Sequence, residues 1–295
     1  ILTPFGAFAR RQLSPDNPLI GNPLFFYYQT NVSPTSGYLD ANGVLLSQSL
    51  YGGRLSTVYN GGYFVGVQAF GGFGENLFEY NIAVMNTPLC SPNTAVNLDK
   101  DAAFHGRVAL HPFIWATIGL SYCIGSFLDH SNVNKFLSDS GGTEQYQQRT
   151  FGLDLNLNYL YYELNVEYIS NRFVAPYVVY DYRFNPPYIS GLGHGSSLDL
   201  ADNELLLDLK IDAPFYPGLF LAGRYNTLSF GNIVDPSNSL RNSIPWDRNV
   251  QKYAAGIGFK PARGVILKVN YEHTAVEIAP RPNLDVVAAQ LSVSF

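Results

Sequence analysis

The residues from 285 to 295, DVVAAQLSVSF, alternate between apolar side chains and small or polar ones. The apolar row comprises Val287, Ala289, Leu291, Val293 and Phe295, and the row between them includes Gln290 and Ser292. A period of two is typical of an extended strand whose two faces differ. This stretch is therefore predicted to be a β-strand with one apolar face, which stays in register up to its final aromatic residue.

The same alternation recurs along the chain, and its polar rows are unusually rich in charged and amide side chains. It is clear in residues 149–159, 162–168, 204–211 and 264–275. Burying such side chains unpaired in a soluble core costs roughly several kcal/mol each, whereas a water-filled interior accepts them and an apolar outer wall faces lipid. The sequence thus predicts an all-β fold, a transmembrane antiparallel up-and-down β-barrel of about 12–14 strands.

The composition agrees with an apolar outer surface. Charged residues make up 14% of the chain and aromatic residues 15%, while soluble domains average roughly 25% charged residues. An apolar band flanked by aromatic girdles explains both departures. No run approaches the roughly 18 apolar residues of a membrane helix. The net charge is −5 and no basic cluster is present, so nucleic acid is not expected as a partner.

The connections suggest one domain, residues 1–295, with two kinds of link between strands. Long polar links lie near 10–47, 86–100, 127–146, 185–198 and 231–248, and they alternate with short turns such as 213–218 and 260–264. Barrels of this type have long extracellular loops and short periplasmic turns. About twelve strands result if 62–85 and 160–184 are single strands, and a break near 71–75 or 174–176 would add more.

Two parts of the chain support a family resemblance. They are LTPFG at 2–6 with Arg10, Arg11 and Asn17-Pro18-Leu19 after it, and the KPARG turn at 260–264 with the closing strand to Phe295. These motifs resemble segments of Gram-negative outer-membrane porins. The resemblance implies outer-membrane lipid as surroundings and a terminal Phe295 that the barrel-assembly machinery reads. It also implies a possible homotrimer, for which the sequence itself gives no interface.

One departure from that family concerns the N-terminal side. In such porins further strands precede LTPFG, and the given sequence does not contain them. Either an N-terminal portion is missing or the barrel is a shorter one, and both alternatives stay open at this point.

The resemblance implies a water-filled channel for passive diffusion of small hydrophilic solutes in the outer membrane of a Gram-negative bacterium. Two alternatives remain: a structural or partner-binding barrel, plugged by or sheathing another protein, and an outer-membrane lipid-modifying enzyme. The enzyme would need a Ser–His pair on the lipid-facing wall. The outward rows supply no evident pair, so we expect no enzymatic activity.

Charged side chains on the polar rows are the candidate selectivity residues. They are Arg54, Glu79, Arg107, Asp154, Glu163, Glu167, Glu204, Asp208, Lys210, Arg224, Lys252, Lys268 and Glu272. Opposed rings of charge would orient polar solutes across the lumen. The alternative is that these groups pair across neighbouring strands and only keep the lumen wet. The near balance of signs favours weak selectivity.

The 10–47 segment is a candidate constriction loop. Its residues Arg10, Arg11, Asp16, Tyr27 and Tyr28 could line a narrowed lumen, with the aromatic rings along a solute path. Alternatively, those rings pack against the wall or at a subunit contact.

The cysteines and histidines suggest one covalent link and no cofactor. Cys90 in a long loop and Cys123 near the same end of a strand could form a disulfide in an oxidising compartment; two free buried thiols are the alternative. Neither HExxH nor CxxCH is present, so we expect no metal and no covalent haem.

Overall fold

The computed structural model describes residues 17–20, 22–24, 58–59, 63–75, 77–90, 102–127, 146–181, 188–234, 243–277 and 283–293, with backbone alone at 176–181, 188–198, 233–234 and 243–244. Eleven strands form one sheet. They are β1 (Gly66–Phe73), β2 (Phe78–Met85), β3 (Ala103–Phe113), β4 (Ala116–Ser126), β5 (Gln147–Tyr159), β6 (Tyr162–Asp181), β7 (Tyr188–Asp212), β8 (Leu219–Phe230), β11 (Val250–Ala262), β12 (Val265–Val276) and β13 (Leu284–Val293). A separate hairpin joins β9 (Asn232–Val234) to β10 (Ser243–Pro245).

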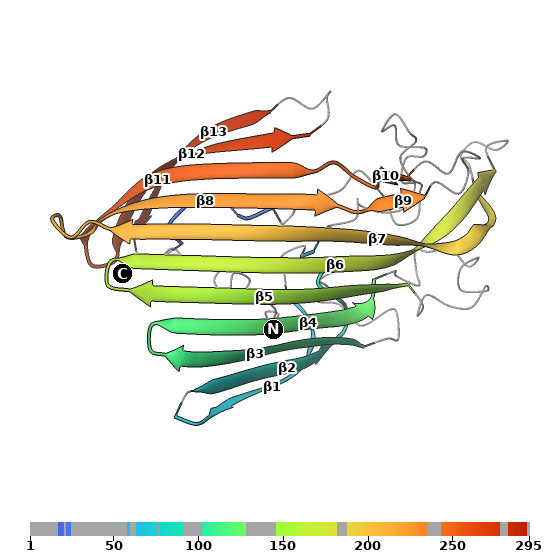
Figure 1. Cartoon of the computed structure of the whole chain (residues 1–295), viewed down its shortest axis with the longest axis horizontal. Helices are drawn as coiled ribbons and strands as arrows, with labels where there is room; N and C mark the ends of the chain where they lie inside the picture. The colour runs from blue at the N-terminus through green and yellow to red at the C-terminus, as the bar shows by residue number, and fades with distance from the viewer. Residues whose placement is uncertain are drawn as a thin grey trace.

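The sheet has the up-and-down order that the sequence predicts. Each strand pairs antiparallel with its neighbour in the order β1-β2-β3-β4-β5-β6-β7-β8-β11-β12-β13. The short turns gather at one end of the sheet (Figure 1), and the strand ends from which the longer links start lie at the other, called the long-loop end below. Within the described residues, β1 and β13 each have one edge without a partner strand. The all-β antiparallel fold is therefore confirmed, as a sheet that does not close over the described part of the chain.

One of the two stretches that the count of about twelve strands took as single strands is broken. Residues 62–85 are not a single strand, because a tight turn separates β1 from β2. Gly74 and Glu75 in this turn have φ values of 68° and 53°, which are left-handed and cannot continue a strand. The break falls at the weak point near 71–75. In the stretch 160–184, β6 is one strand from Tyr162 to Asp181, and the next described residue is Tyr188.

Two predicted loops also need correction. The loop near 185–198 is shorter than predicted because β7 begins at Tyr188 and pairs with β6 along this stretch. The link at 231–248 contains the β9–β10 hairpin, which Trp246 joins to β7 by a hydrogen bond from its Nε1 to the Ala201 carbonyl at 2.6 Å. The Trp246 ring also packs edge-on against Phe230 of β8 at 4.8 Å.

The two faces of the sheet differ as the alternation predicts. The exposed face is apolar and the buried face is polar, the reverse of a soluble protein. Leu120 and Leu153 expose 43% and 46% of their surface, while their strand neighbours Ser121 and Asp154 expose 1% and 2%. The polar side of the sheet is called the inner face below, and the apolar side the outer face. In the part of the chain that the structure describes, no helix is long and apolar enough to cross a membrane.

Aromatic residues collect at the two ends of the outer face. At the short-turn end, the rings of Phe113 and Trp115 stack at 4.9 Å. Toward the long-loop end, Tyr225 of β8 and Tyr253 of β11 lie 5.1 Å apart. The apolar rows lie between these rings, which is the arrangement expected of girdles around an apolar band.

Candidate functional site: the inner face and its internal segment

The register of the sheet places the predicted selectivity residues of the described strands on the inner face. They are Glu79, Arg107, Asp154, Glu163, Glu167, Glu204, Asp208, Lys210, Arg224, Lys252, Lys268 and Glu272. Acids predominate on β5 to β7, and bases on β8, β11 and β12. This common placement follows from the period of two, because every second side chain of a strand points to the same face.

Arg107 and Asp154 form an ion pair that reaches across an intervening strand. Arg107 lies on β3 and Asp154 on β5, and the Arg107 Nη2 donates to Asp154 Oδ1. Gly119 of β4 lies between them, where an added Cβ would collide with both groups. The glycine therefore leaves the space through which the two side chains meet. Both side chains are nearly fully buried.

Three further pairs join neighbouring or nearby inner-face groups. Arg224 binds Asp208 through two hydrogen bonds, Nε to Oδ1 at 2.6 Å and Nη2 to Oδ2 at 2.9 Å. Lys252 Nζ lies 2.7 Å from Glu272 Oε1, and Lys210 Nζ lies 2.8 Å from Asp212 Oδ2. For these residues the structure favours the alternative of pairing within the wall over free rings of charge.

A segment from the N-terminal part of the chain lies against the inner face of β8, β11 and β12. Lys268 Nζ donates to the Asn17 carbonyl at 2.6 Å, and Lys252 Nζ donates to the Asn22 carbonyl at 3.0 Å. The Leu24 amide donates to Asn226 Oδ1 at 2.5 Å. In Figure 1 this segment is the blue trace behind the sheet. We call the described residues 17–20 and 22–24 the internal segment.

Apolar contacts complete the docking of the internal segment. Leu19 exposes 3% of its surface and clusters with Ala222 and Ala254. An added Cβ at Gly256 would lie 2.8 Å from Leu19 Cδ2, so the glycine leaves room for this side chain. Small residues on β8 and β11 thus form a shallow seat for a leucine. Alternation alone gives no sign of this contact.

A second part of the chain occupies the inner side near β2 to β7. Val58 and Tyr59 are buried in one apolar cluster with Phe64, Ile169 and Leu206, among others. Gln148 Nε2 of β5 donates to the Val58 carbonyl at 3.0 Å. The inner face is therefore polar along most of its strands but is covered by the protein's own chain in at least two places.

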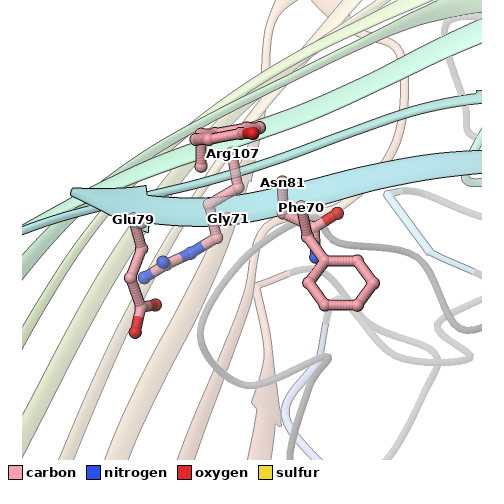
Figure 2. A pocket seen from close by; sticks show the side chains of 7 residues that line it. Phe70, Gly71, Glu79, Asn81 and Arg107 are labelled. Carbon is pink, nitrogen blue, oxygen red and sulfur yellow. The ribbon is translucent and has the colours of Figure 1, made fainter. Parts of the chain in front are cut away.

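A cavity of about 240 Å³ lies at the β1–β2 end of the sheet. Glu79, Asn81, Arg107 and Phe70 line it together with Gly71 and two others. Figure 2 shows these side chains around a common space, with the Glu79 carboxylate and the Phe70 ring on one side of the ribbon. Phe70 is 75% exposed on this inner side, so an aromatic surface and a carboxylate face the same open volume.

The predicted disulfide is not formed. Cys90 and Cys123 are free thiols, and both are buried. Burial, together with the nearby Cys123, raises the pKa of the Cys90 thiol well above its usual range. The two residues do lie close to each other at the long-loop end, as predicted, but as buried thiols.

The remaining predicted residues lie outside the described residues. They are Arg10, Arg11, Asp16, Tyr27, Tyr28, Arg54 and Phe295, and the LTPFG motif lies there too. Within the described ranges, no group of three or more His, Cys, Asp or Glu side chains is placed to hold a metal ion. Sequence reasoning missed Asn226 and the seat for Leu19, although the 10–47 segment that it named as a candidate constriction loop includes the internal segment.

Comparison with solved structures places the fold among outer-membrane β-barrels. The chain is similar to a porin (TM-score 0.50, 9% identity, covering 88% of this chain and 71% of the porin). It is equally similar to the outer membrane channel DcaP of Acinetobacter baumannii (TM-score 0.50, 10% identity, 90% of this chain and 70% of DcaP). The siderophore receptor PirA from Acinetobacter baumannii also has a TM-score of 0.50 at 11% identity.

The extent of these similarities differs between the neighbours. The match covers 78% of this chain but 38% of PirA, so the chain spans less than half of that receptor. No protein-family model matches the chain. No curated protein matches it in sequence. The likeness therefore defines the fold, that of an outer-membrane β-barrel.

Proposed function

We propose that this protein forms a water-filled channel in the outer membrane of a Gram-negative bacterium, through which small hydrophilic solutes diffuse passively. The observation that carries the proposal is the reversed polarity of the sheet, with apolar rows outside and charged rows inside. Such a wall suits lipid on one side and water on the other. The long-loop end faces the extracellular medium and the short turns face the periplasm.

In this channel the inner face acts by geometry and charge, without catalysis. Arg107, Asp208 and Arg224 are paired with opposite charges, so these groups keep the wall wet while each pair adds little net field. Weak selectivity between anions and cations follows. The internal segment narrows the passage beside β8, β11 and β12, which limits solute size. Solutes follow their gradient through the remaining water.

The apolar cluster around Val58 and Tyr59 supports a second candidate, a barrel whose interior is filled. Apolar side chains from five parts of the chain bury each other there, which is unusual for the wall of an open pore. On this proposal the protein would bind or anchor a partner and conduct little. The two candidates predict opposite results in a single experiment.

That experiment measures single-channel conductance of the natural, full-length protein in a planar lipid bilayer under a salt gradient. Stable open steps support the channel, and the reversal potential reports the sign of its selectivity. Absence of steps from protein that is shown by circular dichroism to be folded β-structure would overturn the channel and favour the filled barrel.

A further inference from the structure

The outer face carries charge at a few positions, all of them toward the long-loop end. Among the strand side chains that the structure describes, these exceptions are Arg149, Arg172, Asp199 and Asp285. The Asp285 carboxylate has partners on the neighbouring strand. The Tyr271 hydroxyl donates to its Oδ1 at 2.5 Å, and His273 Nδ1 lies 2.8 Å from the same oxygen. The two arginines are different, since they lie next to each other.

Arg149 of β5 and Arg172 of β6 are direct register partners. Side chains at opposed positions of an antiparallel pair have Cβ atoms roughly 5 Å apart, and like charges there destabilise the pair. Arg172 is bound by Asp199 of β7 through its Nε and Nη2. Arg149 Nη2 donates to the neutral Gln147 Oε1 at 3.2 Å. Among the described residues, Arg149, Arg172 and Asp199 together therefore keep one positive charge that no carboxylate balances.

The height of this pair on the outer face matches the edge of an apolar band. Below Arg149, the outward row of β5 is Phe151, Leu153, Leu155 and Leu157, ending at Tyr159. About ten residues at ~3.3 Å each span ~33 Å along the strand, or ~25 Å along the membrane normal for strands tilted by ~40°. That is the height of a typical apolar band, so the guanidinium groups reach the level of lipid headgroups.

We propose that Arg149 and Arg172 together bind a phosphate group of an outer-leaflet lipid. A guanidinium presents parallel N–H donors that match phosphate oxygens, and such charge-assisted bonds are about twice as strong as neutral ones. A bound phosphate removes the repulsion between the two arginines and balances the excess charge. Tyr168 lies lower on the outer face, opposite Leu153, and its hydroxyl donates to Asn203 Oδ1 at 2.9 Å on the side toward the arginines. The proposal rests on the membrane placement given under the proposed function.

The test titrates the full-length protein in dodecyl maltoside micelles with dihexanoyl phosphatidic acid, using dihexanoyl phosphatidylcholine and inorganic phosphate as comparison ligands. Isothermal titration calorimetry gives the dissociation constants. The wild type should bind phosphatidic acid at least tenfold more tightly than either comparison ligand. Arg149→Gln should lose about tenfold in affinity for phosphatidic acid. Arg149→Lys keeps the charge but lacks the paired N–H donors of the guanidinium, so its affinity should lie between those of the wild type and Arg149→Gln.

A matched control and a second readout separate the possible failures. Gln147→Ala removes the neutral partner of Arg149 and should leave the affinity within twofold of the wild type. Equal binding by the wild type and Arg149→Gln would overturn the proposal, as would equal affinity for inorganic phosphate and the lipid. Bilayer conductance distinguishes a failure of the lipid-site proposal from a failure of the channel proposal. A protein that conducts but shows no preference for phosphatidic acid would overturn only the lipid site.

Discussion

If the protein is the proposed channel, replacing Lys268 by methionine should release one end of the internal segment and open the channel further. The Lys268 amine donates to the Asn17 carbonyl at 2.6 Å, while its side chain is almost fully buried on the inner face. Methionine keeps the length and apolar stem of lysine but cannot donate. The seat for Leu19 at Ala222, Ala254 and Gly256 is left unchanged.

The size of the effect follows from the bond that is lost. A hydrogen bond from a charged donor contributes ~1.5–3 kcal/mol, and ~1.4 kcal/mol corresponds to a factor of ten in an equilibrium constant. The ratio of released to docked segment should therefore rise by roughly 10- to 150-fold. Burial of Leu19, at ~1.5–3 kcal/mol, continues to favour docking. We therefore expect exchange between two states instead of permanent release.

Single-channel recording in planar bilayers would show this exchange as transitions to a higher conductance level. Lys210→Met is the matched control, because it also removes one inner-face lysine while that amine pairs with Asp212 and does not contact the internal segment. Both variants change the lumen charge equally, so a difference between them reports the segment. If Lys268→Met and Lys210→Met gave the same conductance levels and the same dwell times, the proposed constriction would be refuted.

Three other changes test the inner face and the thiols. Gly119→Ala should lower the free energy of unfolding in urea by ~1–3 kcal/mol, because the added methyl group overpacks the Arg107–Asp154 pair. Gly223→Ala is the control and should have little effect, since the nearest atom to an added Cβ there is 3.9 Å away. Equal urea midpoints for the two variants would contradict the close packing at Gly119. Asp208→Asn removes the charge that balances Arg224, so the reversal potential should shift toward anion selectivity, and an unchanged potential would show that this pair lies off the ion path. Maleimide should label Cys90 slowly at pH 8 in the folded protein, because the raised pKa keeps the buried thiol protonated. If the unfolded protein could be labelled only after reduction, the two cysteines would instead form a disulfide.

The features that sequence could predict are those that depend on local periodicity. Alternation assigned Asp154 and Lys268 to the inner face and Leu153 and Val269 to the outer face, and the register agrees. Each assignment needs only the parity of a residue within its own strand. The order of the strands also follows, because consecutive strands of a chain usually lie next to each other in a sheet.

The features that the sequence could not predict depend on backbone conformation at single residues or on contacts between residues far apart in the chain. The break between β1 and β2 is set by left-handed φ values at Gly74 and Glu75, in a stretch whose composition also suits a strand. The extension of β7 back to Tyr188 depends on pairing with β6. The Leu24 amide and Asn226 are 202 positions apart, a separation at which no local pattern reports contact.

The pairing of inner-face charges changes what can control passage through the proposed channel. A ring of unpaired lysines and arginines would set the sign of the permeant ion, but Arg107, Arg224 and Lys252 are each matched by a carboxylate. Lys268 donates to a backbone carbonyl of the internal segment. Most of the positive charge thus stabilises the wall or holds the segment, and little is left to act at long range on solutes. Control of passage then falls to the space that the internal segment occupies, so conductance should respond more strongly to its docking than to the removal of any one wall charge.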